Sequence, residues 1–172
     1  LLITFFLTVI FDLTVAIEVG LVIACVLFMK RVMETTEISV ITDEIDPNKE
    51  SDIAVHEENL MIPKGIEVYE INGPYFFGIA TKFEETMTQL GDRPKVRIIR
   101  MRKVPFIDST GIHNLTALCE MSQKEKTTII LSGVNKNVHN VLEKAGFYEL
   151  LGKENICPNI NVALERAKSL VE

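Results

Sequence analysis

Apolar residues occupy almost every position of residues 1–29, and only two charged residues, Asp12 and Glu18, interrupt them. This segment is too long and too apolar for an ordinary core helix, which indicates a membrane segment. One straight helix would extend roughly 43 Å at about 1.5 Å per residue, whereas the hydrocarbon core of a bilayer is about 30 Å thick. The pattern therefore predicts two helices, residues 1–11 and 13–29, with Asp12 at or near the turn between them.

The basic pair Lys30 and Arg31 follows the apolar segment directly. By the positive-inside rule this end lies in the cytoplasm, so residues 31–172 are expected to be cytoplasmic. A signal peptide is the alternative, but it would need a basic region before the apolar run and a small-residue cleavage site after it. Since the chain begins at Leu1 without methionine, we expect it to be the tail of a longer protein with earlier spans.

Glu18 lies inside the second predicted span, where an ionisable group that faces lipid costs about 2.5 kcal/mol or more. It should therefore face protein, water or the interface. One interpretation places it on an ion or proton path, and the other makes it a helix-contact or interfacial group near the Asp12 turn. We favour the second. Small residues that allow close helix approach suit a member of a helix bundle: Thr4, Thr8, Thr14, Ala16, Gly20 and Ala24.

Residues 31–60 are predicted to be an acidic linker between the membrane segment and a soluble domain, residues 61–172. The chain has a formal net charge of -6, and residues 34–58 carry much of the excess acid against a single base, Lys49. Such a segment stays solvated and avoids anionic headgroups. A Ca²⁺ loop would need a central glycine and a terminal glutamate at fixed spacing, which the acids do not match. They are Glu34, Glu37, Asp43, Glu44, Asp46, Glu50, Asp52, Glu57 and Glu58.

The soluble part alternates strand and helix signals, which predicts an α/β layer structure. A sheet of four to five strands covered mainly by helices is expected, with about 110 residues for one core. The predicted strands are residues 60–62 and 66–71, joined as a hairpin at 63–65, then 96–101 and 127–131. The helices present apolar stripes at Ala80 to Leu90, Ile112 to Ser122, Val138 to Ala145 and Val162 to Leu170, with caps at Gly91, Asn135 or Asn137, Gly146, and Asn159 or Asn161.

Catalytic and metal-binding patterns are missing from the sequence. The three cysteines and three histidines show no disulfide framework and no metal-ligand spacing. No nucleophile with an adjacent base, no paired acids and no glycine-rich phosphate loop is found, so the chain is predicted not to be an enzyme and to need no cofactor.

A basic cluster surrounds one predicted strand, but it lacks interleaved aromatics, so nucleic acid is not predicted as a partner. We interpret these bases as strand-end and sheet-face residues. Contact with an anionic ligand or lipid is the alternative. The cluster comprises Arg93, Lys95, Arg97, Arg100, Arg102 and Lys103.

The turn Asp108, Ser109, Thr110 and Gly111 joins an apolar strand end to the first turn of a helix. Free backbone N–H groups and the helix dipole favour negative charge there, so the turn is a candidate anion-binding site or a position for a phosphate on Ser109 or Thr110. The other interpretation is structural: Asp108 or Ser109 caps the helix, and Gly111 permits close packing. The residues alone leave both open.

The order of elements, this turn and the later run Asn-x-x-Val-x-x-x-Leu-x-x-Ala-Gly-Phe, residues 135–147, together resemble the STAS domain. That fold is shared by anti-sigma factor antagonists and the cytoplasmic tails of SulP-type anion transporters. Residues 4–31 resemble the last transmembrane region of bacterial SulP proteins. The resemblance leaves only the acidic linker uncovered.

The resemblance implies the regulatory or assembly tail, with the last membrane span, of a secondary anion transporter in the bacterial inner membrane. Its cargo would be sulfate, bicarbonate or a dicarboxylate. The implied partners are the transmembrane domain of the same protein, the lipid bilayer and a second copy of the chain in a homodimer. A regulatory protein or a nucleotide at the STAS domain is also considered. The alternative is a membrane-tethered signalling switch that binds a kinase or anti-sigma-type partner through phosphorylatable Ser109.

Overall fold

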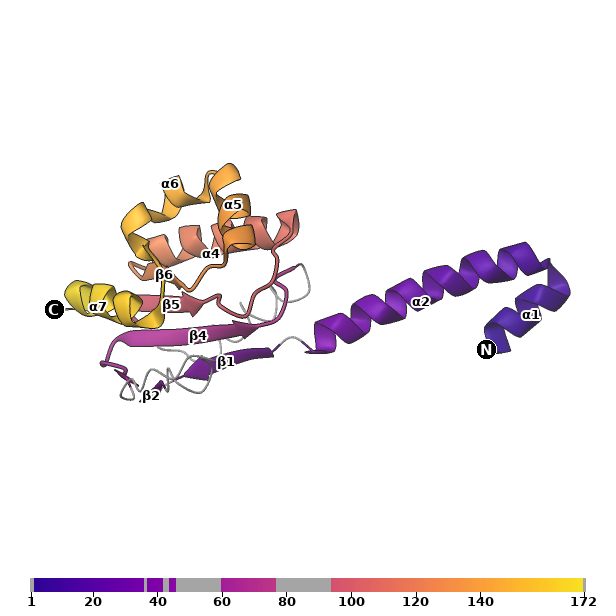
Figure 1. The fold of residues 1–172 in the computed structure, drawn as a ribbon, viewed down its shortest axis with the longest axis horizontal. Helices are drawn as coiled ribbons and strands as arrows, with labels where there is room; N and C mark the ends of the chain where they lie inside the picture. The colour runs from indigo at the N-terminus through magenta and orange to yellow at the C-terminus, as the bar shows by residue number, and fades with distance from the viewer. Residues whose placement is uncertain (1, 36, 42–43, 46–59, 77–93, 172) are drawn as a thin grey trace. The chain divides into compact units, whose positions relative to one another are not determined.

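The computed structural model divides the chain into two compact units, Leu1–Thr35 and Thr36–Glu172, which are described one at a time (Figure 1). We call them the helical unit and the sheet unit. The residues that the structure describes are 2–35, 37–41, 44–45, 60–76 and 94–171.

The helical unit consists of α1, Leu2–Ile10, and α2, Leu13–Thr35. The break at Asp12 is confirmed, and its side chain explains why a new helix starts there. The Leu13 N–H donates to Asp12 Oδ1 at 2.7 Å, and the Ala16 N–H donates to the Asp12 carbonyl at 3.1 Å. Asp12 thus satisfies N–H groups at the start of α2. The second helix runs to Thr35, six residues beyond its predicted end.

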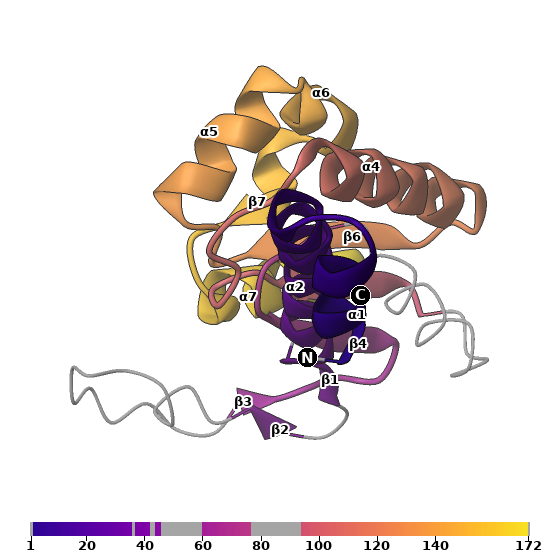
Figure 2. The same ribbon diagram turned by 90° about the vertical axis from the view of Figure 1, so that its right-hand side faces the viewer.

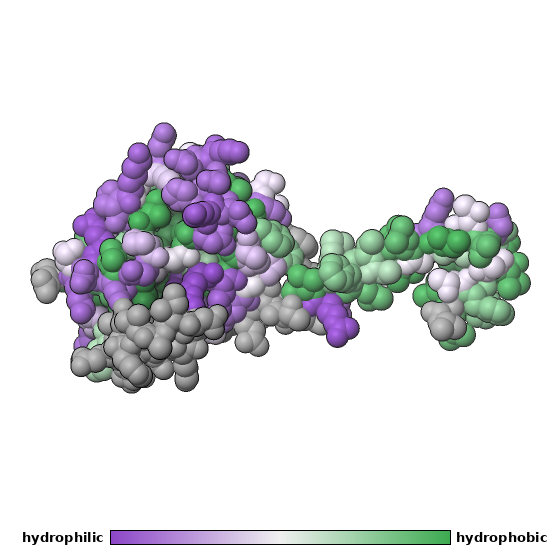
Figure 3. Space-filling model, viewed as in Figure 1, coloured by the Kyte–Doolittle hydropathy of each residue, from purple (hydrophilic) through white to green (hydrophobic). Residues whose placement is uncertain are grey.

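Close contact between α1 and α2 depends on small residues, as the sequence predicts. Ala16 is only 4% exposed, and a Cβ added to Gly20 would lie 3.2 Å from Thr4 Cγ2. Most large apolar side chains of this unit are exposed, and Figure 3 shows the resulting apolar surface. Leu13–Val32 is the one helix among the described residues that is long and apolar enough to cross a membrane. Its apolar side chains point outward, unlike those of a soluble core helix.

The sheet unit is built on five strands in the order β1-β4-β5-β6-β7. β1 pairs antiparallel with β4, and the remaining neighbours pair in parallel. The sequence prediction of four to five strands covered by helices is therefore confirmed. The strands are β1, Glu37–Ile41; β4, Ile66–Asn72; β5, Val96–Arg100; β6, Thr128–Ser132; and β7, Ile156–Cys157.

Both faces of the central strands are apolar, because successive side chains point to opposite faces. Tyr69, Ile99 and Leu131 lie side by side in register and belong to one hydrophobic cluster. One residue earlier, Val68, Ile98 and Ile130 form the matching row of a second cluster. Nearly continuous apolar strands of this kind require a covering layer on each face.

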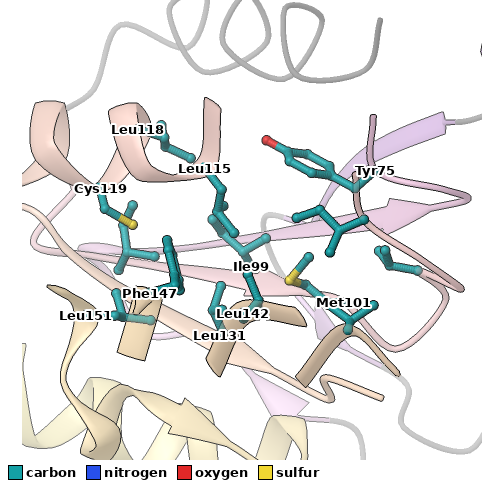
Figure 4. Packing of buried hydrophobic residues seen from close by; sticks show 14 of the residues in the cluster. Tyr75, Ile99, Met101, Leu115, Leu118, Cys119, Leu131, Leu142, Phe147 and Leu151 are labelled. Atoms are coloured by element: carbon teal, nitrogen blue, oxygen red, sulfur yellow. The ribbon is translucent and has the colours of Figure 1, made fainter. Parts of the chain in front are cut away.

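Helices supply both layers (Figures 1 and 2). On one face lie α4, Ser109–Lys124; α5, Lys136–Lys144; and α6, Phe147–Leu151. Figure 4 shows side chains of α4 and α6, among them Leu115 and Phe147, gathered around Ile99 in this cluster. The helix α7, Ile160–Val171, packs on the other face.

The structure differs from the predicted linker within residues 31–60. α2 extends to Thr35, and Glu37–Ile41 form β1 at the edge of the sheet. Ile38 and Val40 pack against the main hydrophobic cluster, and Ile41 packs against the second one, which offsets the acidic composition around them. Treating all of 31–60 as a solvated linker was therefore wrong for this strand. Most of the remaining interval lies outside the described residues.

The predicted hairpin at residues 63–65 is also wrong. β3, Leu60–Met61, pairs with β2, Glu44–Ile45, in a separate two-stranded sheet, while β4 joins the main sheet. The predicted helix with Ala80 to Leu90 and its Gly91 cap lies outside the described residues. The sequence pattern did not predict the short elements α6, β7 and the 3₁₀ turn Lys153–Asn155. In α7 the buried stripe is Ile160, Ala163, Leu164 and Ala167, whereas Val162 is 40% exposed.

Candidate functional site

The turn at residues 108–111 follows the carboxyl end of β5, where the chain crosses beside the segment after β4. The Tyr75 N–H donates to the Phe106 carbonyl at 3.1 Å, and Tyr75 and Ile107 form a parallel bridge. Tyr75 is 1% exposed and Ile107 is 6% exposed. These two buried side chains fix the last residues before the turn.

Asp108 is the N-cap of α4. Its backbone is extended, with φ -95° and ψ 175°, and its Oδ1 accepts from the Gly111 N–H at 2.6 Å. The Ile112 N–H donates to the Asp108 carbonyl at 3.0 Å. The capping interpretation of Asp108 is therefore correct, and Ser109 is the first residue of the helix. Such a cap stabilises a helix by about 0.5–2 kcal/mol.

Gly111 is buried against the chain that leads from β4. A Cβ at this position would lie 2.5 Å from the Tyr75 carbonyl oxygen and 2.9 Å from Ile107 Cγ1. Any larger residue would have to move this backbone. Glycine is thus required by the close approach of two segments, as the structural interpretation of this turn predicts.

Ser109 and Thr110 are both exposed in the first turn of α4. The backbone N–H groups at a helix start favour negative charge. The turn therefore offers two accessible hydroxyls, and Phe106, two residues before Asp108, is 53% exposed. A phosphate on either hydroxyl would meet the positive end of the helix dipole.

The two membrane ionisable residues belong to the helical unit, apart from this turn in the sequence. Asp12 caps α2 as described, and Glu18 is exposed on α2. Asp12 therefore has a structural role, because it accepts hydrogen bonds from N–H groups at the start of α2. An interfacial or helix-contact role for Glu18 stays a prediction.

The basic cluster divides among several acidic partners. Arg97 Nε lies 3.3 Å from Glu67 Oε2, and Arg100 Nη1 lies 3.5 Å from Glu70 Oε1. Both arginines are about 5% exposed. The interpretation of Arg97 and Arg100 as sheet-face residues is correct, because both lie on β5, are buried and pair with a carboxylate. Arg93 lies outside the described residues.

The two cysteines of the sheet unit, Cys119 and Cys157, are buried, and their raised thiol pKa values disfavour the reactive thiolate. Burial, with a smaller contribution from the Glu120 charge, raises the pKa of the Cys119 thiol to about 12. Burial also raises the pKa of Cys157.

Over the described ranges, no group of three or more His, Cys, Asp or Glu could hold a metal ion. His139 instead contacts Tyr148, with Nδ1 and Oη 2.5 Å apart.

One feature was missed by sequence reasoning: a cavity of about 260 Å³ at the carboxyl ends of β5 and β6 and the start of α7. It contains Arg100 and Arg102 of the basic cluster. The other lining residues are more than 25 positions away from these two arginines in the sequence, so only the fold brings them together. Pro158 and Asn159, a typical helix-start pair, were the available sequence signal.

A mixed sheet with an antiparallel edge strand, helices on both faces and a capped Asp-Ser-Thr-Gly turn defines an α/β domain of the STAS class. Residues 59–163 match the family model of the STAS domain, and the chain belongs to this family. More narrowly, it carries the STAS domain of a sulfate-transporter-family protein. A sulfate transporter family protein from Wolinella succinogenes, known from a crystal structure, is 44% identical to this chain in sequence. The two structures match with a TM-score of 0.62, over 65% of this chain and 92% of that one.

Relatives of known sequence agree with this assignment. YvdB of Bacillus subtilis, named as a candidate sulfate transporter, is 28% identical over 153 residues, which cover 88% of this chain and 27% of YvdB. The chain spans about a quarter of the length of the curated relatives it matches. The murine anion transporter Slc26a9 shares the fold, with a TM-score of 0.72 at 19% identity over 98% of this chain and 28% of that one.

Proposed function

We propose that this chain is the regulatory or assembly part of a secondary anion transporter, with a last membrane span followed by a cytoplasmic STAS domain. The observation that carries the proposal is the direct succession of the two parts. The membrane-length helix Leu13–Val32 is followed by a sheet unit whose relative of 44% identity is a sulfate transporter family protein. Sulfate, bicarbonate or a dicarboxylate is the proposed cargo.

The chain connection supports a coupling role. α2 ends at Thr35 and β1 begins at Glu37, so Thr36 alone separates the last helical residue from a strand of the main sheet. β1 is anchored along its full length by antiparallel pairing with β4. This short distance along the sequence supports the proposal that the STAS domain senses or biases movements of the membrane part.

The orientation follows from the charges beside the span. Lys30 and Arg31 lie at the carboxyl end of the apolar window in α2, which the positive-inside rule places in the cytoplasm. The sheet unit then lies in the cytoplasm of a bacterial cell, at the inner membrane. In Figure 3 many of the described residues on the visible face of this unit are hydrophilic, with apolar patches between them.

Uptake of labelled anions tests the proposal. Cells expressing the full gene product that contains this chain should accumulate sulfate, bicarbonate or a dicarboxylate above cells with an empty vector. Removal of residues 37–172 should change the uptake rate while the protein stays in the membrane. No uptake of any of these anions by a protein that is present in the membrane would contradict the transport proposal.

A second candidate function is a phosphorylation switch at Ser109. The favouring observation is that Ser109 is exposed at the start of α4, while its neighbours Asp108 and Gly111 hold the turn rigidly. A phosphate there would add charge without breaking a buried contact, and it would change the surface around Phe106. A kinase or anti-sigma-type protein is the proposed partner.

Phosphorylation by a kinase from the same organism tests the switch. The wild-type chain should accept one phosphate at Ser109, Ser109→Ala should accept none, and Thr110→Ala should behave as wild type. Equal labelling of the wild type and Ser109→Ala would contradict the assignment of Ser109.

Two further partners come from the family resemblance. A nucleotide at the turn would give a saturable heat signal in a calorimetric titration of the chain with ATP or GTP, and no heat at millimolar nucleotide would remove this idea. A homodimer would have twice the 19.4 kDa mass of the chain by light scattering, after correction for detergent.

A further inference from the structure

The cavity at the start of α7 lies at the carboxyl edge of the main sheet, separate from the turn at residues 108–111. It has a volume of about 260 Å³, somewhat smaller than the roughly 300–1,000 Å³ of drug-sized ligand pockets. Three segments surround it: the end of β5, the end of β6 and the first turn of α7. The lining residues are Arg100, Arg102, Ser132, Gly133, Val134, Pro158, Asn159, Ile160 and Asn161.

The first turn of α7 directs backbone donors to this region. Asn159 accepts the Val162 N–H on its side chain at 3.0 Å and the Ala163 N–H on its carbonyl at 3.2 Å. The N–H of Ile160 has no acceptor within the helix, as is general for the first helical residue. α7 has 12 residues, long enough for a dipole that favours an anion at this end.

Ser132 gives an independent indication of a ligand. Its side chain is fully buried and lines the cavity, and its hydroxyl has no hydrogen-bond partner in the part of the chain that the structure describes. A buried hydroxyl without a partner costs about 1–3 kcal/mol, so such groups are rare unless something binds them. A hydroxyl donates readily to an anionic oxygen.

Among the described residues that line the cavity, the charged ones are both basic, Arg100 and Arg102. Arg100 is 5% exposed, and the carboxylate beside it, Glu70, is shared between Arg100 Nη1 at 3.5 Å and Lys103 Nζ at 3.9 Å. Glu70 thus pairs with two cations at the end of β5, Arg100 and Lys103.

Backbone shape also favours close approach here. Gly133 has φ +69°, a conformation that other residues rarely adopt, and a Cβ on it would lie 3.2 Å from Arg102 Cβ. Glycine therefore lets the segment after β6 pass directly beside Arg102. This packing holds the arginine backbone next to the start of α7.

We propose that this cavity binds a small tetrahedral oxyanion, sulfate or phosphate, between Arg102, the Ser132 hydroxyl and the first turn of α7. Arg102 would supply charge, Ser132 a hydroxyl donor, and Ile160 a backbone donor. The volume accommodates one such ion with bound water. The proposal does not depend on transport by the membrane part, since every group belongs to the sheet unit.

Nuclear magnetic resonance titration of the ¹⁵N-labelled 172-residue chain in detergent micelles tests this site. Sodium sulfate and sodium phosphate are added in separate arms at constant ionic strength, balanced with sodium chloride. The amides of Gly133, Ile160 and Asn161 should shift and saturate with at least one oxyanion. Arg102→Gln and Ser132→Ala should each raise the dissociation constant about tenfold or more. Lys168→Gln, which removes one charge at the far end of α7, should match the wild type.

Several outcomes would overturn the proposal. Shifts that grow linearly with both oxyanions, or that saturate elsewhere in the sheet unit, would show that the cavity is not a binding site. Saturation that persists unchanged in Arg102→Gln and Ser132→Ala would exclude these side chains. Ser132→Ala removes one oxygen atom only, so it keeps the test valid even if Arg102→Gln fails to fold.

Discussion

Gly111 lies against Tyr75 so closely that a Cβ on the glycine would be 2.5 Å from the Tyr75 carbonyl oxygen. The contact joins the first turn of α4 to the segment that follows β4, and Tyr75 itself is held by its hydrogen bond to Phe106. The exposed residues Ser109 and Thr110 therefore belong to a turn whose backbone is held by close packing. A modification there would alter the surface while leaving the core in place.

Replacement of Gly111 by alanine should destabilise the sheet unit. Alanine favours helices, but its methyl group would press on backbone, and overpacking of this kind costs about 1–3 kcal/mol. Urea unfolding should show a loss of about 2 kcal/mol. Thr110→Ala, in the same turn but exposed, is the control and should change stability by less than about 0.5 kcal/mol. A Gly111→Ala chain as stable as the control would contradict the close contact.

Asp108 should stabilise α4 through its acceptor oxygen. Asp108→Ala removes the acceptor of the Gly111 N–H and should cost about 1 kcal/mol in the free energy of unfolding. Asp108→Asn keeps an acceptor and should cost much less. Equal losses in both variants would mean that the negative charge, and not the cap, is what matters.

Negative charge at Ser109 should be favourable. Ser109→Glu places a carboxylate in the first turn of α4 and should stabilise the sheet unit by about 0.3–1 kcal/mol at low salt. The gain should shrink in 1 M NaCl, because salt screens exposed charges. Ser109→Gln is the neutral control. If glutamate and glutamine behave alike at low salt, the turn does not favour anions.

Alkaline pH should weaken the sheet unit partly through Cys119. Burial raises the pKa of its thiol from 9.0 to about 12, so the folded state keeps a proton that the unfolded state loses above pH 9. The free energy of unfolding should fall between pH 9 and pH 12, with this thiol contributing at most about 1.4 kcal/mol per pH unit. Below pH 9 this thiol contributes no pH dependence.

Comparison of slopes isolates the thiol. Cys119→Ala should reduce the loss of stability per pH unit just above pH 9, whatever its effect on absolute stability at pH 7. Chemical unfolding at pH 8.0, 9.0, 9.5 and 10.0 measures these slopes. An unchanged slope would mean that Cys119 titrates alike in both states.

Local sequence signals predicted the parts of the fold that depend on neighbouring residues. Asp12 marked the helix break. Of the two predicted caps, Asn135 and Asn137, the structure has Asn135 at the start of α5, where its Oδ1 accepts from the Val138 N–H. Asp108 likewise capped α4. Caps and turns act over three or four positions, so a single sequence contains what is needed to find them.

Local signals of this kind do not predict which distant segments pair. Glu37–Ile41 lies among acids, and this composition predicts a linker, yet the segment pairs with β4 and covers the core with Ile38 and Val40. The hairpin predicted at 63–65 failed for the same reason, since strand partners are chosen by the whole sheet. The cavity at α7 combines β5, β6 and a helix start, which no local pattern brings together.

Protease accessibility tests most directly the proposed arrangement, a membrane-spanning α2 joined to a cytoplasmic STAS domain. The chain, with an epitope tag at its carboxyl end, is expressed in bacteria, and trypsin is added to intact spheroplasts or to inverted membrane vesicles. We predict that the tag survives in spheroplasts and is lost in inverted vesicles, with the protein resistant to carbonate extraction. Loss of the tag in spheroplasts, or release of the chain by carbonate, would contradict the claim.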